Sequence, residues 1–509
     1  MSTLTMVFDL LTPQERRQAL LLIRLVIAMS LVEVVGIASV TPFLALLADP
    51  SAATTNPVLV WVQEAFGFEN DRAFLTAVGV AVMVVLLITN SLLAAGLVVL
   101  TRFGSLRNHS ISRRLLARFL KQPYAFFLDH NSAALANDVV MEVEQVVNAV
   151  ILPGLNLVAK GAAALAIILL LLFVDPVLTL MMGVLLGGAY VALSMATRKY
   201  LERIGRERVA ANQARYQATH EALGAIKELK LLGREAELVR RYDAPSFAFA
   251  QFQAGSRLIA MLPRYALETI AFGSIVAVVI FLLRGDRSIE QVVPVLGLYA
   301  FAGYRLLPAL QQVFHSAALF RYGTGALNEV HKYFEGRIAD DEVLDVLDDR
   351  QVASDLHISG RIRFEGVTFA YDGASPVLRD VDLEIEPLSS VGIVGATGSG
   401  KTTLVDLLLG LLDPSEGRIT VDGVDMVGAV RRRWQRHVGY VPQSIFAADD
   451  TITRNIALGL PDEAIDMELV RRAARLAQID TFIEHELPQG FDTIVGENGV
   501  RLSEGVNQL

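Results

Sequence analysis

Residues 395–402 have the residue types and the spacing of a phosphate-binding loop. They read Gly-Ala-Thr-Gly-Ser-Gly-Lys-Thr and match the pattern G-x-x-x-x-G-K-[ST]. Glycines let backbone N–H groups turn toward an anion, and the N-terminus of the following helix adds a favourable dipole. The apolar runs 391–394 and 403–409 are expected to form the buried strand and the helix that this motif requires. The segment is therefore predicted to bind a nucleoside triphosphate; a chance glycine-rich turn is the alternative.

Two residues of this loop have specific predicted roles. Lys401 is the predicted catalytic cation, because its ammonium group can reach the β- and γ-phosphates. The hydroxyl of Thr402 is a predicted ligand of Mg²⁺. The residues expected to contact the nucleotide in this segment are Gly395, Ala396, Thr397, Gly398, Ser399, Gly400, Lys401, Thr402 and Thr403.

The composition of the whole chain indicates a membrane protein with a second, soluble part. The chain has 509 residues, too many for one compact unit, and 53% of them are hydrophobic while only 19% are charged. Its mean hydropathy is +0.45. A net charge of -9 argues against a nucleic-acid partner. The absence of cysteine excludes disulfide scaffolds, thiolate zinc sites and cysteine nucleophiles.

Apolar stretches of membrane-spanning length are concentrated in the first two thirds of the chain. Residues 73–101 and 176–197 carry no charge, and both exceed the ~20 residues that a helix needs to cross a bilayer. Four further stretches carry one to three charges, so six spans are predicted in all. Those four are 18–48, 145–174, 258–284 and 289–318. The first is too long for the core of a signal peptide, although a cleaved export signal is the alternative reading.

The distribution of Lys and Arg predicts the orientation. The connections 102–147 and 198–257 are rich in both residues, whereas the loop 49–72 contains only Arg72. Basic loops stay on the cytoplasmic side, so the N-terminus and both long connections are expected there. Apolar residues recur at helical spacing in these connections, which are therefore predicted to be helical extensions of the spans.

The chain is expected to divide into a membrane domain over 1–330, an acidic linker over 331–358 and a nucleotide-binding domain over 359–509. Acidic residues dominate 340–349, which is typical of a solvated connector. Residues 361–369 alternate between apolar and polar and are predicted to form a strand.

Six spans followed by a nucleotide-binding segment resemble an ABC transporter of the exporter type, over essentially the whole chain. The resemblance implies an α-helical membrane domain followed by an α/β P-loop domain, with ATP as the nucleotide. Tyr371 lies where that family has its base-stacking aromatic, although a core aromatic at the end of a strand is the alternative. Gln443 matches the glutamine that approaches Mg²⁺ and the attacking water. Residues 495–499 resemble the exporter stretch that precedes the family signature.

The signature itself departs from the family pattern. The family has Leu-Ser-Gly-Gly-Gln, whereas residues 502–506 read Leu-Ser-Glu-Gly-Val. Ser503 and Gly505 retain a hydroxyl and a closely approaching backbone for the γ-phosphate on the partner subunit. Glu504 and Val506 instead introduce a carboxylate and remove an amide, so the segment is either a tolerated variant or a weakened ATP site.

The family's Walker B strand, catalytic Glu and switch His are absent from the sequence, which stops four residues after Gly505. The sequence is therefore expected to be a fragment truncated at its C-terminus, without the general base of hydrolysis, so that as it stands it binds nucleotide poorly and hydrolyses none.

Ionisable residues inside predicted spans mark candidates for substrate contact. They are Glu33 in the first span, Arg264 and Glu268 in the fifth and Arg305 in the sixth. Arg264 and Glu268 lie four residues apart and share one helical face, so a purely structural ion pair is an alternative. For Arg305 the alternative is snorkelling to the headgroups. The residues around these positions resemble the exporter branch that flips lipid-linked oligosaccharides.

The resulting interpretation is a half-transporter of the bacterial inner membrane that works as a homodimer or heterodimer. It is expected to use ATP to flip or export an amphipathic, lipid-linked substrate. The alternatives are a peptide, lipid or drug exporter on the same fold, and a catalytically impaired subunit of a heterodimer. Residues 122–131 and 215–222 are the candidates for the coupling helices that dock on the nucleotide-binding domains.

Overall fold

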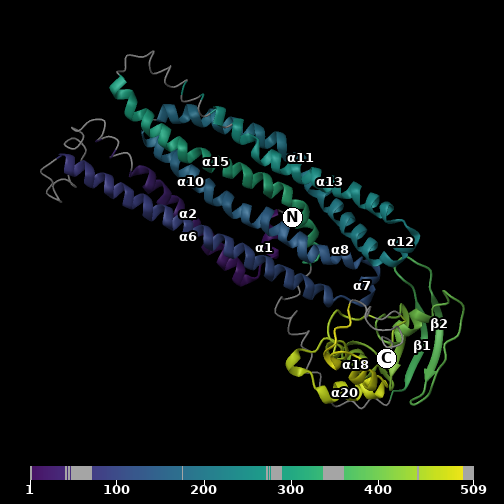
Figure 1. Cartoon of the computed structure of the whole chain (residues 1–509). Coiled ribbons are helices and arrows are strands. Elements are labelled where there is room, and N and C mark those ends of the chain that lie inside the picture. Colours follow the sequence, from purple (N-terminus) through teal and green to yellow (C-terminus); the bar gives the residue numbers. More distant parts are fainter. Residues whose placement is uncertain are drawn as a thin grey trace. The chain divides into compact units, whose positions relative to one another are not determined.

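Long helices account for most of the first two thirds of the chain (Figure 1). The computed structural model describes residues 3–39, 43, 46, 71–174, 176–266, 268–270, 273, 276, 289–335, 360–443 and 446–496. The chain divides into two units, Met1–Gln351 and Val352–Leu509. The longer helices of the first unit are α2 (Pro13–Ala38), α6 (Asp71–Leu120), α10 (Leu152–Val174), α11 (Pro176–Gly224), α13 (Glu235–Met261) and α15 (Ile289–His331).

These helices confirm most of the expected spans and both helical extensions. Helices cover 73–101, 145–174 (interrupted only by π-helical turns), 176–197 and 289–318, and α2 covers the first span as far as residue 38. The fifth span, 258–284, lies only partly within the described residues. The helix α6 continues to Leu120 and α11 to Gly224, so each leaves its apolar stretch and runs on through the basic connection.

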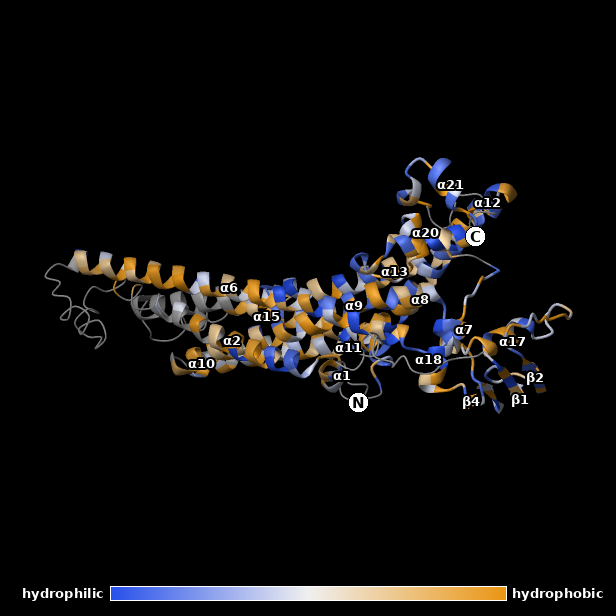
Figure 2. Cartoon of the chain, turned by 90° about the horizontal axis from the view of Figure 1, so that it is seen from below, coloured by the Kyte–Doolittle hydropathy of each residue, from blue (hydrophilic) through white to orange (hydrophobic). Residues whose placement is uncertain are grey.

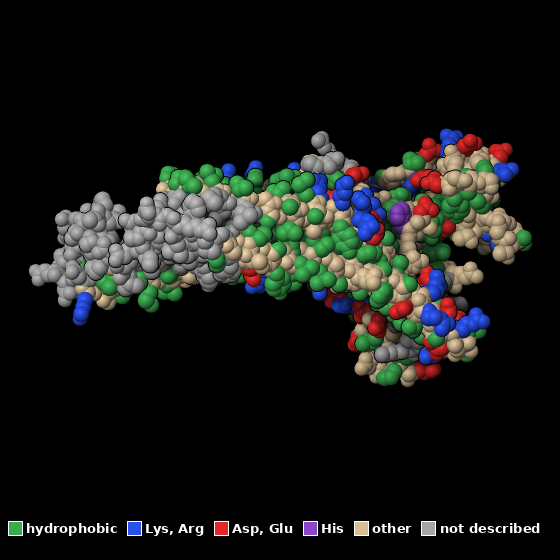
Figure 3. Space-filling model, turned by 90° about the horizontal axis from the view of Figure 1, so that it is seen from above, with side chains coloured by type: hydrophobic (Ala, Val, Ile, Leu, Met, Phe, Trp, Pro, Cys, Tyr) green, Lys and Arg blue, Asp and Glu red, His purple; other side chains and the backbone are tan. Residues whose placement is uncertain are grey.

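Two helical stretches in the described part of the chain are long and apolar enough to cross a membrane, Arg72–Leu120 and Ser132–Phe173. Hydrophobic residues predominate along the part of α6 away from α7 (Tyr124–Asp129) (Figure 2). Hydrophobic side chains also cover much of the described surface of this unit (Figure 3). Met83, Leu87 and Phe173 are 71%, 69% and 91% exposed, as expected for side chains that face lipid.

The packed interior of the helical unit lies where α1 (Thr3–Asp9), α2, α6 and α15 meet. Leu10, Ile111, Leu115 and Leu327 are fully buried there. The helix α10 packs against α2 and α15, and α11 packs against α13 and α15. Burial of these aliphatic side chains fixes how the helices of this unit cross.

A polar contact also holds the start of α2 in this interior. Thr12 and Glu15 form a reciprocal capping box: the Thr12 amide donates to the Glu15 carboxylate over 2.9 Å, and the Glu15 amide donates to the Thr12 hydroxyl over 3.2 Å. The buried Glu15 carboxylate also pairs with Arg107 and Arg114 of α6. The first turn of α2 is therefore tied to α6.

Short helical segments join the long ones. They are α7, α8 (Ser132–Asn137), α9 (Val143–Val146), α12 (Ile226–Leu232) and two π-helical turns, η1 (Asp138–Glu142) and η2 (Val147–Ile151). Residues 122–131 do contain a short helix, α7. Residues 215–222 lie within α11, which runs unbroken to Gly224, and the separate short helix α12 follows.

The second unit begins with a four-stranded antiparallel sheet. Its strands are β1 (Ile362–Phe369), β2 (Leu378–Ile385), β3 (Glu416–Val421) and β4 (Val424–Asp425), in the order β2-β1-β3-β4. The strand predicted at 361–369 is confirmed as β1. One face of the sheet is buried against α17 (Lys401–Leu408), with Val367 and Leu407 fully buried.

The buried strand expected at 391–394 is not present. These residues have no regular secondary structure, and the Val394 side chain is 97% exposed. A parallel strand is stabilised by neighbouring strands on both sides, and in the described residues no strand pairs with this segment. The expected helix after the loop is confirmed as α17.

A second packed cluster follows in the chain. It involves α19 (Ile452–Ile456), α20 (Met467–Leu476), α21 (Asp480–His485) and the short turn η4 (Gly490–Asp492). Thr451 and Asp466 cap the first two of these helices, because each side chain accepts a backbone N–H of the first turn. Along the chain, α18 (Gly428–His437) follows the last strand and precedes this cluster.

Candidate nucleotide-binding site

The predicted phosphate loop lies between the sheet and the N-terminus of α17. Gly398 and Gly400 have φ values of +82° and +87°, a region that side chains strongly disfavour, and Gly400 is the N-cap of the helix. A Cβ atom on Gly395 would lie 2.6 Å from the Ser399 hydroxyl oxygen. Backbone geometry therefore favours glycine at Gly398 and Gly400, whereas a side chain at Gly395 would displace the Ser399 hydroxyl.

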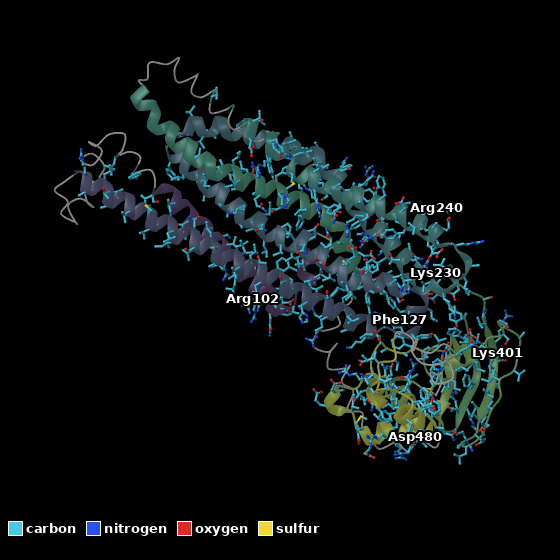
Figure 4. All side chains as sticks on the ribbon, in the orientation of Figure 1. Arg102, Phe127, Lys230, Arg240, Lys401 and Asp480 are labelled. Carbon is cyan, nitrogen blue, oxygen red and sulfur yellow. The ribbon has the colours of Figure 1, made fainter. Side chains whose placement is uncertain are left out.

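Lys401 folds back over the loop from the first position of α17 (Figure 4). Its ammonium group donates hydrogen bonds to the carbonyl oxygens of Gly395, at 2.8 Å, and Ala396, at 2.7 Å. The loop itself is closed by a bond from the Ser399 amide to the Ala396 carbonyl, at 3.2 Å. A full positive charge thus lies at an exposed glycine-rich turn that ends in a helix N-terminus, which fits an anionic phosphate chain.

The donor set also fits Mg²⁺ held together with a nucleotide. Mg²⁺ in such sites is held by one or two protein groups, by waters and by the phosphates. Thr402 is exposed at the second position of α17 and offers one hydroxyl ligand. Four residues further along, burial raises the pKa of the Asp406 carboxyl group, so this helix carries a desolvated acid on its packed side.

Tyr371 lies beside the same helix. Its hydroxyl is 3.1 Å from the hydroxyl of Thr403, and its ring packs edge-on against Phe369, with the ring centres 4.9 Å apart. The Tyr371 ring also contacts the hydrophobic core of the sheet, so the core-aromatic interpretation is correct for part of this side chain. The structure nevertheless brings Tyr371 to the first turn of α17, next to the loop.

The remaining predicted nucleotide contacts are less well placed. Gln443 is exposed in an irregular segment, and the described part of the chain gives no hydrogen bond between it and residues 395–402. Ser503 and Gly505 lie outside the described residues, as do Glu504 and Val506.

The predicted membrane-embedded charges form one observed cluster. Arg264 and Glu268 are joined by an ion pair of 2.7 Å, as their spacing suggests. The amide of Gln311, from α15, donates to the same carboxylate over 3.2 Å. The hydrogen bond between Gln311 and Glu268 therefore joins the expected spans five and six. Glu33 lies in α2 and Arg305 in α15, but their side chains are outside the described residues.

A second polar cluster was not identified from the sequence. Glu142 of η1 is fully buried and pairs with Arg208 of α11. The amide of Asn212 donates to the side-chain oxygens of Asn137, at 2.8 Å, and Glu142, at 3.0 Å. The sequence holds no clear signal for it, because Asn137 and Glu142 lie in a segment that also contains other polar residues. The π-helical turn places these side chains in the helix contact.

Asp138 belongs to the same cluster, in the polar segment that precedes the apolar stretch 145–174. It is 1% exposed, and the hydroxyl of Tyr333 donates to one of its oxygens over 3.2 Å. Burial raises the pKa of Asp138 to about 7; the carboxylates of Glu329 and Glu142 add to this shift, and Lys332 opposes it. Asp138 therefore holds a proton well above the ordinary pH range of an aspartate.

Two family models match this chain. The ABC transporter transmembrane region matches residues 36–302, and the ABC transporter model matches residues 378–509. The chain is similar to a solved bacterial Atm1-family ABC exporter with ATP bound, with a TM-score of 0.72 and 21% identity, covering 97% of this chain and 82% of that one. This likeness shows the fold alone.

Curated relatives agree with the family models. An ATP-dependent lipid A-core flippase of Ralstonia nicotianae is 30% identical over 416 residues, which is 78% of this chain and 66% of the relative. A protein of the same name from Pseudomonas aeruginosa is 28% identical, over 79% and 64% of the two chains. A fatty acid ABC transporter ATP-binding/permease protein of Mycobacterium bovis is 37% identical over 42% of this chain and 34% of its own. The chain thus spans about two thirds of the flippases' length, at 66% and 64%.

Proposed function

The chain belongs to the ABC transporters, and from this premise we propose that it uses ATP to flip or export an amphipathic, lipid-linked substrate across a bacterial inner membrane. The observation that carries the proposal is the arrangement of Lys401 over the 395–402 loop, in a chain that also contains the family's transmembrane region. In this family, ATP binding at such a loop drives the movement of the transmembrane helices.

Each side chain around the loop has its own role in binding the nucleotide. Lys401 neutralises the phosphate chain, Thr402 holds Mg²⁺, and Tyr371 stacks on the base. Gln443 orients the attacking water, and Ser503 and Gly505 complete the site of a second subunit. Bound Mg²⁺ supplies Lewis-acid stabilisation of the transferred phosphoryl group.

The substrate assignment rests on the relatives and on Arg264. Several relatives are named lipid A-core flippases. A guanidinium group in a membrane cavity is suited to phosphate oxygens, because its planar fork makes two parallel hydrogen bonds. Arg264 is 62% exposed and already oriented by Glu268, so it is available for an anionic headgroup. Arg305 and Glu33 are the further candidates.

The assembly that we propose is a dimer, either of two identical chains or with a second half-transporter. The N-terminus and the nucleotide-binding domain lie on the cytoplasmic side, as the basic connections indicate. The proposed coupling segments are residues 122–131, which contain α7, and residues 215–222, which lie in α11. The fatty acid transporter relative favours a lipid exporter as the second candidate function.

The test is transport by the purified full-length protein in proteoliposomes. ATP-dependent movement of a lipid-linked oligosaccharide is compared with movement of a fluorescent fatty acid and of a cationic drug. We expect the first to move and the Lys401→Ala protein to move none. Movement of the fatty acid alone would favour the second candidate, and ATP-independent movement of every substrate would refute the proposal.

A further inference from the structure

The buried polar cluster between α8, η1 and α11 has no part in the proposed nucleotide site. Its central side chain is Asn212 of α11, which is 1% exposed. The Asn212 amide nitrogen donates to the Asn137 side-chain oxygen, at 2.8 Å, and to the Glu142 carboxylate, at 3.0 Å. Asn137 and Glu142 are themselves fully buried, so water does not compete for these two hydrogen bonds.

The oxygen of the same amide bonds to a residue further along α11. Arg215, one turn after Asn212, donates to this oxygen over 2.6 Å. The Arg215 guanidinium group also lies over the Phe249 ring of α13, 4.0 Å from the ring centre. Asn212 therefore uses both ends of its amide, and its hydrogen bonds connect Asn137 to Arg215.

Both of these partners lie at the proposed coupling segments. Asn137 ends α8, the helix that directly follows the segment 122–131, and Arg215 is the first residue of the segment 215–222. A buried network of this kind has few alternative arrangements, because each broken bond leaves a desolvated polar group without its partner. The side chain of Asn212 is thus placed to hold the two segments at one spacing.

Building on the proposed coupling segments, we propose that Asn212 is a positioning residue that fixes the segments 122–131 and 215–222 to each other. Movement of either segment on ATP binding is then passed to the transmembrane helices as the movement of one body. Asn212 acts through Asn137 and Arg215, not through the nucleotide or the substrate.

The spacing of the two segments can be measured with a pair of spin labels. The chain contains no cysteine, so Asp129→Cys and His220→Cys introduce one labelling site at an exposed position of each segment. Labelled subunits of the full-length protein are diluted with unlabelled ones, so that distances within one subunit are recorded with and without ATP. We expect one narrow distance distribution that ATP leaves unchanged, and a broader distribution in Asn212→Ala.

Two further variants show whether the effect belongs to this network. Asn137→Ala removes the 2.8 Å hydrogen bond from the other side and should broaden the distribution as Asn212→Ala does, so the test does not depend on one variant folding. Ser112→Ala is the matched control, because it removes a hydrogen bond of 2.8 Å from α6 to the Val139 carbonyl of η1 without involving α11. This control should keep the narrow distribution.

A second measurement separates positioning from a loss of stability. The amount of lipid-linked oligosaccharide moved per ATP hydrolysed should fall by about 3–10-fold in Asn212→Ala, the scale of one ordinary hydrogen bond, and stay unchanged in Ser112→Ala. A protein that is only less stable would lose transport and hydrolysis in proportion, so this ratio would not change.

The outcomes distinguish this inference from the proposed function. A wild-type distance that changes with ATP, or a distribution that Asn212→Ala and Asn137→Ala leave narrow, would overturn the positioning role. Equal broadening in Ser112→Ala, or unchanged transport per ATP in Asn212→Ala, would also overturn it. A wild-type protein that keeps one narrow distance and moves no substrate would instead refute the proposed function and leave the positioning role in place.

Discussion

At the scale of single residues, Lys401 carries the largest share of the expected affinity for ATP. Its ammonium group donates to two loop carbonyl oxygens, at 2.8 and 2.7 Å, so its positive charge lies at the loop where the phosphates are proposed to bind. Charge-assisted hydrogen bonds contribute about 1.5–3 kcal/mol, so Lys401→Ala should weaken ATP binding by about 10–100-fold. Calorimetry measures this loss. The control is Lys199→Ala, an exposed lysine of α11; equal affinities in both variants would contradict the assignment.

The buried Asp138 gives the stability of the helical unit a defined pH dependence. Its pKa is raised from 3.8 to about 7 in the folded state, so the folded chain binds a proton that the unfolded chain has released. Its protonated form therefore contributes stability that is complete below pH 3.8 and is lost as the pH rises through about 7. In this pH range the free energy of unfolding falls by at most about 1.4 kcal/mol per pH unit because of Asp138.

Asp138→Asn should remove this slope, because the amide has no proton to release. Thermal unfolding in detergent is measured for both proteins in a series of buffers between about pH 5 and pH 8, spaced by about half a pH unit. The wild-type melting temperature should fall relative to that of the variant as the pH rises. The groups facing Asp138 are Glu142 on the same π-helical turn, Glu329 on α15, and Lys332 and Tyr333 directly after α15. Parallel pH profiles would show that none of this dependence arises from Asp138.

At the scale of helices, two glycines let α11 and α15 approach each other closely. A Cβ atom on Gly205 would lie 2.2 Å from the Tyr322 carbonyl oxygen, and one on Gly325 would lie 2.5 Å from the Gly205 carbonyl oxygen. Backbone atoms cannot move aside as a side chain can. Gly205→Ala should therefore destabilise the helical unit by about 1–3 kcal/mol, measured as a lower melting temperature in detergent.

Gly224→Ala is the matched control for that variant. Gly224 ends the same helix, and a Cβ atom there would meet nothing within 4 Å. This change should leave the melting temperature unchanged or raise it slightly, because alanine favours a helix more than glycine does. A melting temperature of Gly205→Ala no lower than that of Gly224→Ala would contradict the close approach of these helices.

The sequence was most informative where the signal is local. The spans, the helical extensions and α17 follow from apolar stretches and from a short motif, so they could be predicted without knowledge of the rest of the fold. The strand expected at 391–394 was wrong because a buried strand depends on neighbours elsewhere in the chain.

Contacts between distant residues were the least predictable part of the candidate sites. Gln311 bonds Glu268 across 43 positions, and Tyr371 reaches Thr403 across 32. No periodicity within one helix encodes such pairs, because they depend on how two elements cross. The Arg264 and Glu268 pair could be predicted, since both residues lie on one turn of one helix.

At the scale of the whole molecule, each unit supplies a different half of the proposed transport cycle. The unit Val352–Leu509 contains the phosphate loop, whereas the unit Met1–Gln351 contains the polar groups expected to meet the substrate. Binding of ATP and contact with an anionic headgroup should therefore be separable by mutation. A change in the second set of groups should stop transport without affecting the nucleotide site.

Arg264 and Arg305 are the residues for that test. An anionic headgroup that leaves water needs cationic partners, and the Arg264 guanidinium is held in place by Glu268 at 2.7 Å, which is itself bonded to Gln311 at 3.2 Å. The double Arg→Ala protein should bind ATP with normal affinity and fail to move a phosphate-bearing lipid-linked substrate in proteoliposomes. Arg305→Lys should retain part of the transport, because the ammonium group keeps the charge and loses the planar fork.

The matched control for charge removal is Arg240→Ala, outside the predicted spans. Arg240 is exposed and pairs with Glu237 on the same helix, a contact of the kind that contributes little to stability. This variant should transport normally, so that a loss in the Arg264 and Arg305 variants reflects their place in the membrane. Full transport by the double Arg→Ala protein would instead show that the headgroup is not held by these cations, and a neutral peptide or drug would then be the better substrate class.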